Sequence, residues 1–136
     1  MPAATKKHAK TQPHAKSTLH LSAADFFKAK LAYESTPHAL KHALDAGTVL
    51  VLDVRTPDAF AREHIPGARN IPQAELPANF GKLPKDKTLV TYCWNITCAL
   101  ATRAALELAQ KGFPVQELFG GIEEWKRSGF PVESGK

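Results

Sequence analysis

The sequence contains few cysteines, and this shortage excludes several classes of protein. Only two of its 136 residues are cysteine, Cys93 and Cys98. Two cysteines cannot form a disulfide framework, and one CxxxxC pair is poor spacing for zinc, so we expect no metal and no cofactor. Thiol chemistry in a reducing compartment fits better, and we predict a cytoplasmic protein.

Apolar residues are missing where membrane and export signals need them. No stretch approaches the roughly 18 continuous apolar residues of a membrane span. Residues 1–20 lack the apolar segment of a secretory signal, and they contain no arginine, which argues against a mitochondrial transit peptide. We therefore expect no membrane partner.

Acidic residues are absent from the first twenty positions, and this absence explains the basic balance of the chain. The formal net charge of +5 comes mostly from four lysines in residues 1–20. A charged tail on a nearly neutral domain does not indicate a nucleic-acid binder. Because residues 1–20 cannot bury enough apolar surface to fold alone, we predict a disordered basic tail, or alternatively a weak anionic tether. Residues 21–136 are predicted to form one domain.

From residue 21 onward, short apolar runs alternate with helical segments that begin at capping residues. The runs 48–54 and 88–92 are almost continuously apolar, as expected for strands buried on both faces of a sheet. Residues 68–71 and 115–119 are further strand candidates. Helices are predicted over residues 22–33, 36–47, 56–63, 98–112 and 120–129. This alternation predicts an α/β domain with a parallel sheet.

Glycine and proline mark the connections between these segments. Residues 73–86 contain two prolines and a glycine, and we expect an irregular surface connection there. Gly120 and Gly121 are expected to permit a tight turn from strand to helix. Trp125, in the last helix, is expected to belong to the core.

Cys93 follows the predicted strand 88–92 and precedes a predicted helix. Ligands of open α/β sheets bind beyond the carboxyl ends of the strands, and a helix that starts there directs unpaired N–H groups at them. Such a position favours the thiolate, the reactive form of cysteine. Cys93 is therefore a candidate nucleophile, although cysteine is also among the residues most often buried without any chemical role.

Several segments resemble the rhodanese-like sulfurtransferase family. They are "VLDVRTPDAFAREHIPGARNIP", "LVTYCW", "ATRAALELAQKGFPVQEL" and "GGIEEWKRSGFPV", in that order. The resemblance covers residues 21 to 133 and implies a three-layer α/β/α domain with a central, mostly parallel sheet. It also implies that Cys93 forms the family's persulfide.

The resemblance implies a sulfur-transfer mechanism. Cys93 would take sulfane sulfur from thiosulfate or from a small-molecule or protein persulfide. A thiol acceptor, either a small thiol or a thioredoxin-like protein, would then remove it. The N–H groups of Trp94, Asn95, Ile96, Thr97 and Cys98 would cradle the negative sulfur.

Three further residues match family positions and are expected to support the site. Asp53 and Arg55 are predicted to fix the strand end and the next turn by hydrogen bonds, with a direct substrate role for Arg55 as the alternative. His64 is expected to pack and to form hydrogen bonds, with proton transfer as its alternative.

The loop after Cys93 departs from the family's usual pattern, because residues 94–97 contain neither glycine nor arginine. This departure keeps open a non-catalytic binding or sulfur-trafficking module. Cys98 has two interpretations: simple burial, or attack on the persulfide to form a Cys93–Cys98 disulfide, which requires Cα atoms within about 7 Å. The second interpretation would make the protein a thiol-redox sensor.

Overall fold

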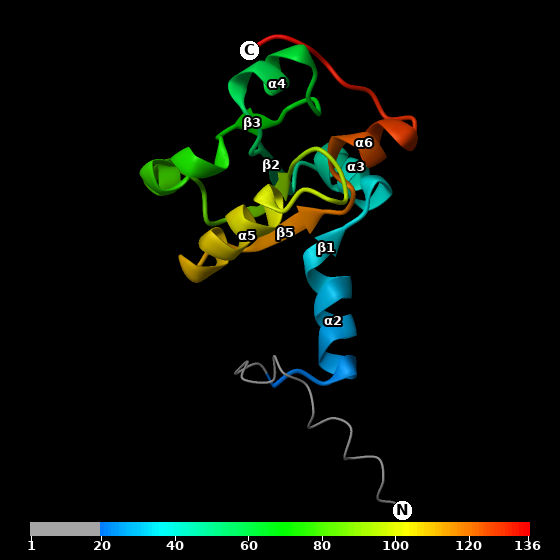
Figure 1. The fold of residues 1–136 in the computed structure, drawn as a ribbon, viewed down its shortest axis with the longest axis vertical. Coiled ribbons are helices and arrows are strands. Elements are labelled where there is room, and N and C mark those ends of the chain that lie inside the picture. Colours follow the sequence, from blue (N-terminus) through cyan, green and yellow to red (C-terminus); the bar gives the residue numbers. More distant parts are fainter. Residues whose placement is uncertain (1–19) are drawn as a thin grey trace, which may run out of the picture.

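The computed structural model describes residues 20–136. The tail predicted over residues 1–20 therefore lies outside the described residues, except for His20. Figure 1 shows a sheet with helices packed around it and one helix that extends away from the body. The helices are α2 (Ala23–Tyr33), α3 (Pro37–Ala46), α4 (Pro57–Arg62), α5 (Leu100–Gln110) and α6 (Gly121–Arg127).

The sheet has five strands, and all of its pairings are parallel. The strands are β1 (Glu34–Ser35), β2 (Val49–Asp53), β3 (Arg69–Asn70), β4 (Thr88–Tyr92) and β5 (Val115–Leu118). Their order across the sheet is β1-β5-β4-β2-β3. The parallel sheet predicted from the alternating pattern is confirmed. The short edge strand β1 was not predicted.

Two apolar clusters cover the two faces of the sheet, because side chains of a strand alternate between faces. Leu52 and Leu89 pack with Leu108 of α5 on one face. Val51 and Val90 belong to a second cluster, together with residues of α3 and α6 that include Trp125. The three-layer α/β/α architecture is confirmed, and Trp125 is a core residue as expected.

Local signals explain where most helices begin. Thr36 and Thr56 accept hydrogen bonds from backbone N–H groups of α3 and α4, and each helix has proline in its first turn. Helix α5 differs, since it begins at Leu100 and not at residue 98, and Ala99 before it provides no side-chain cap. Residues 73–86 contain two short 3₁₀ helices, Gln73–Glu75 and Pro77–Lys82. None of the helices within residues 20–136 combines the length and the apolar composition that a membrane-spanning helix needs.

Candidate active site

A cleft of about 200 Å³ lies at the carboxyl ends of β4 and β5. Cys93 directly follows β4 and is only 2% exposed at the base of this cleft. The first turn of α5 contributes Ala101 and Thr102 to the cleft wall. Helix α5 begins two residues after Cys98 without a side-chain cap, so the positive end of its dipole lies at the cleft. The cleft is therefore suited to negative charge on sulfur.

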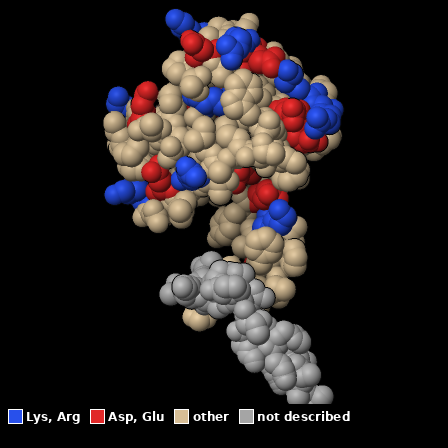
Figure 2. Space-filling model, viewed as in Figure 1, with Lys and Arg blue, Asp and Glu red and all other residues tan. Residues whose placement is uncertain are grey.

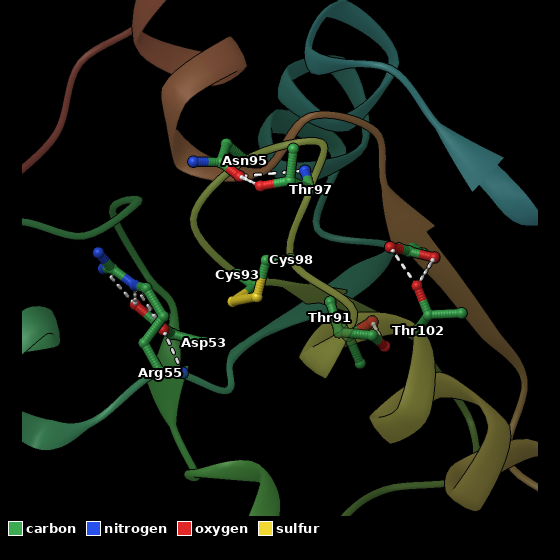
Figure 3. Close-up of a disulfide and its surroundings, with 10 residues drawn as sticks. Asp53, Arg55, Thr91, Cys93, Asn95, Thr97, Cys98 and Thr102 are labelled. Atoms are coloured by element: carbon green, nitrogen blue, oxygen red, sulfur yellow. Dashed lines mark hydrogen bonds and ion pairs between the residues drawn. A yellow bond between two sulfur atoms is a disulfide. The ribbon is translucent and has the colours of Figure 1, made fainter.

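Cys93 and Cys98 are joined in a disulfide, which Figure 3 shows at the centre of the site. Their Cα atoms are 6.5 Å apart, within the range that a disulfide can bridge. Cys98 is partly exposed, so simple burial does not describe it. The sequence left open either simple burial of Cys98 or a disulfide with Cys93, and the structure contains the disulfide.

The cysteine loop, residues 93–98, is held by the polar side chain of Asn95. The side-chain oxygen of Asn95 accepts hydrogen bonds from the Thr97 N–H at 3.1 Å and from the Thr97 hydroxyl at 2.7 Å (Figure 3). The Cys98 N–H donates to the Asn95 carbonyl at 3.1 Å. Two of the five N–H groups predicted to cradle a persulfide are therefore bonded within this loop. Ile96, at the loop's tip, is exposed.

Helix α6 also holds the cysteine loop, through hydrogen bonds to its first two carbonyls. The Ile122 N–H donates to the Cys93 carbonyl, and the Glu123 N–H donates to the Trp94 carbonyl, both at 3.0 Å. This approach requires glycine at position 121, where φ is +64° and a Cβ would lie 2.6 Å from the Cys93 carbonyl oxygen. The Gly-Gly pair predicted the tight turn, but not that the turn supports the cysteine loop.

A buried ion pair joins Asp53, the last residue of β2, to Arg55. The Asp53 carboxylate accepts hydrogen bonds from Arg55 Nη2 at 2.7 Å, from Arg55 Nε at 3.0 Å and from the Tyr92 hydroxyl at 2.6 Å. Arg55 Nη2 also donates to the Glu63 carbonyl at 2.7 Å. Burial and the neighbouring Asp53 carboxylate raise the pKa of Tyr92 far above its ordinary value, so its hydroxyl remains a donor. These contacts join the ends of β2 and β4.

The ring of Trp94 covers the guanidinium of Arg55, whose central carbon lies 4.5 Å from the ring centroid. Arg55 Nη1 is buried and has no hydrogen-bond partner in the part of the chain that the structure describes. The face of an aromatic ring attracts such a cation. This contact couples the ion pair to the cysteine loop.

His64 is buried beside the last described residues and does not line the cleft. Its ring stacks on Phe60 with centroids 3.7 Å apart. Because a carbonyl can only accept, His64 Nδ1 donates to the Phe60 carbonyl at 2.8 Å. Its Nε2 lies 3.4 Å from a carboxylate oxygen of Glu133. His64 therefore packs α4 against the C-terminal segment.

Two carboxylates at the cleft, Glu34 and Glu117, were missed by the sequence interpretation. Among its lining residues the cleft has these two acids and no lysine or arginine. Burial raises the pKa of Glu117, and the nearby Glu34 raises it further, while hydrogen bonds from the Thr102 hydroxyl oppose the shift. Lys30 forms an ion pair with Glu34 at 2.9 Å. The sequence signal was present, since Glu117 stands near the end of a predicted strand that adjoins the cysteine strand.

The all-parallel sheet with helices on both faces makes the chain an α/β protein. Residues 36–128 match the model of the rhodanese-like domain family. The chain belongs to this family.

Individual relatives carry different descriptions. A sulfurtransferase of Allochromatium vinosum is 37% identical over 89 residues, which are 65% of this chain and 81% of that protein. An HTH-type transcriptional regulator of Mycobacterium tuberculosis is 38% identical over 91 residues, which are 67% of this chain but 40% of the regulator. The chain thus spans less than half of that relative. A crystal structure of a Bacillus halodurans protein has a TM-score of 0.77 and 38% identity, covering 82% of this chain and 84% of that one.

Proposed function

We propose that this protein is a sulfurtransferase that carries sulfane sulfur on Cys93. The observation that carries the proposal is the position of Cys93, at the end of a buried strand, in a cleft and beside the uncapped start of α5. The family match and a relative named as a sulfurtransferase support the same chemistry.

The reaction has two transfer steps and begins from the reduced protein. The Cys93 thiolate attacks the outer sulfur of a donor, the donor's S–S bond breaks, and the inner group leaves with the bonding electron pair. Thiosulfate would release sulfite, and a persulfide would release a thiolate. An acceptor thiolate, from a small thiol or a thioredoxin-like protein, then attacks the outer sulfur of the Cys93 persulfide and restores the Cys93 thiolate. The uncapped start of α5 stabilises the negative sulfur throughout.

The charges at the cleft favour one class of donor. Thiosulfate is a dianion, and the cleft presents Glu34 and Glu117 but no basic lining residue. Like charges repel across a small cleft. We therefore place a persulfide on a small molecule or protein before thiosulfate as the preferred donor.

Intact-protein mass spectrometry tests the proposal. The reduced protein is exposed briefly to thiosulfate or to a small persulfide, and the mass is compared for wild type, Cys93→Ser and Cys98→Ser. Wild type and Cys98→Ser should gain one sulfur atom, about 32 Da, which a reductant removes. Cys93→Ser is the matched control and should gain nothing. If the reduced wild type gains no sulfur from either donor, the proposal is wrong.

The disulfide favours a second candidate, a thiol-redox sensor. The Cys98 thiolate would attack the inner sulfur of the Cys93 persulfide, release hydrosulfide and leave the disulfide. In the same experiment, wild type would then lose its added sulfur and two hydrogens, while Cys98→Ser would keep the persulfide. A non-catalytic binding module is the remaining alternative, since one relative is named as a transcriptional regulator. Such a module would take up no sulfur, and Cys93→Ser would keep its partner binding.

A further inference from the structure

Helix α2 exposes large apolar side chains that nothing in the described chain covers. Phe26 is 49% exposed, Phe27 is 58% exposed and Leu31 is 85% exposed. No residue of this 11-residue helix is buried. Figure 1 shows α2 extending away from the body, and in Figure 2 most of its surface belongs to uncharged residues. Because helices this short are marginal alone in water, α2 needs a packing partner.

Within residues 20–136, the bonds and ion pairs that attach α2 to the body lie near its C-terminal end. The Gln116 side chain donates to the Ala32 carbonyl at 3.0 Å. Lys30 pairs with Glu34 and lies 5.9 Å from the centroid of the Phe119 ring. The apolar N-terminal half of α2, including the Phe26–Phe27 ring pair, lies beyond these attachments. No described residue covers that half, so its cover has to come from outside residues 20–136 of the same molecule.

An apolar groove of about 1000 Å³ lies beside the base of α2. Its walls include Ala105, Leu106 and Ala109 of α5, together with Phe113 and Val115. Leu106 is 58% exposed there, although it lies at the centre of α5. Tyr33, at the end of α2, also lines the groove. Residues 20–136 thus contain an apolar helix and, next to it, an apolar groove, and no other described residue covers either of them.

We propose that two copies of this chain form a reciprocal dimer in which α2 of each copy lies in the apolar groove of the other. A two-fold axis near the base of α2 would cover both features of both chains at once, as in an isologous interface. Half-exposed aromatic side chains bury about 100 Å² each. Phe26, Phe27 and Tyr33, with Leu31 and Leu106 at about the same area each, therefore bury about 1,000 Å² in total over the two copies, which meets the lower limit for a specific interface.

Charge and composition both favour a second copy of the chain, and not the chain's own residues 1–19, as the occupant of the groove. Glu117 is the charged side chain among the groove's lining residues, and α2 presents Lys28, since Lys30 already pairs with Glu34 of its own chain. A partner helix therefore brings positive charge to a groove with an acidic side chain. Residues 1–19 contain only Met1 and Leu19 as large apolar residues, and they cannot fill the groove.

Sedimentation equilibrium of the full chain tests the dimer. Wild type should sediment as a dimer, and Leu31→Asp on α2 and Leu106→Asp in the groove should each weaken dimerisation by about 100-fold or more, because each dimer buries the substituted side chain twice. Arg103→Asp is the matched control, since Arg103 is exposed on α5 and does not line the groove. It should leave the dimer unchanged. Circular dichroism checks that each variant is folded.

Mixing the two defective variants distinguishes a helix in a groove from other dimers. Leu31→Asp keeps an intact groove and Leu106→Asp keeps an intact α2, so their mixture should form one proper contact and recover part of the association. Wild type that stays monomeric up to about 1 mM overturns the proposal, because a specific dimer associates well below that concentration. A dimer that neither substitution weakens also overturns it. So does a monomer in which the α2 amides are strongly protected from hydrogen exchange.

Discussion

Replacing Gly121 by alanine should loosen the cysteine loop while leaving the rest of the fold in place. The new methyl group would lie 2.6 Å from the Cys93 carbonyl oxygen and 2.7 Å from the Trp94 carbonyl carbon, both backbone atoms that cannot rotate away. At φ +64°, alanine also adopts the left-handed conformation, which costs about 1–2 kcal/mol. Relief of the contact requires α6 and the loop to separate. Separation breaks two hydrogen bonds, each contributing about 1 kcal/mol.

Gly129→Ala separates the cost of the left-handed conformation from the cost of the close contact with the cysteine loop. Gly129 has φ +87°, and a Cβ there meets no atom within 4 Å, so only the left-handed conformation contributes. Urea denaturation should therefore show that Gly121→Ala costs about 2 kcal/mol more than Gly129→Ala. That difference corresponds to about a thirtyfold loss of hydrogen-exchange protection at the N–H groups of Ile122 and Glu123. Sulfur loading of Cys93 should slow to a similar extent.

Equal destabilisation by the two alanines would refute this reasoning, as would unchanged exchange at Ile122 and Glu123. Either result would mean that the loop does not depend on its contact with α6. The exchange measurement needs no donor or acceptor, so it stands even if the protein transfers no sulfur.

Three other substitutions have defined outcomes. Arg55→Met should lower the free energy of unfolding, measured in urea, by about 3–5 kcal/mol, because it leaves the Asp53 carboxylate buried without its cation. A decrease below about 1 kcal/mol would contradict the role of the ion pair. Thr91→Val should cost about 1–2 kcal/mol, since it leaves the Ala101 carbonyl without the hydroxyl that donates to it at 2.9 Å, and an unchanged urea midpoint would argue against this bond. Because the pKa of Glu117 is raised, the folded protein binds the proton of this carboxyl more tightly than the unfolded chain does. The free energy of unfolding of the wild type should therefore fall as pH rises from 4.5 through the raised pKa of Glu117. Glu117→Gln should lack this decrease. Glu117→Gln should also raise kcat/KM for thiosulfate by about three- to tenfold at low salt, with the gain disappearing near 1 M salt; a gain that persists at high salt would exclude charge as its cause.

The parallel sheet and most helices could be predicted because their signals are local. The apolar runs 48–54 and 88–92 became β2 and β4, and the Thr-Pro pairs marked the starts of α3 and α4. The start of α5 was placed two residues too early. Cys98 could have begun a helix, but the turn at Asn95 and the disulfide keep it in the loop.

The missed parts of the site depend on contacts between residues that are distant in the sequence. Nothing near Gly121 in the sequence indicates that a Cβ at this position would collide with the carbonyl of Cys93. Likewise, Glu34 and Glu117 meet only because β1 pairs with β5. The exposure of α2 was also unpredictable, since its capping residue and its apolar residues are typical of a helix that packs on its own domain.

The hydrogen bonds from α6 to the cysteine loop decide when, during biosynthesis, the loop can take its final shape. A ribosome makes Cys93 before it makes β5 and α6, so the growing chain has its thiol before it has the N–H groups of Ile122 and Glu123 that position the loop. Until α6 emerges and docks, the carbonyls of Cys93 and Trp94 have no anchor. The loop that carries Cys93 is thus among the last parts of the described fold to take shape, and Cys93 reaches its position in the cleft only when the fold around it is nearly complete.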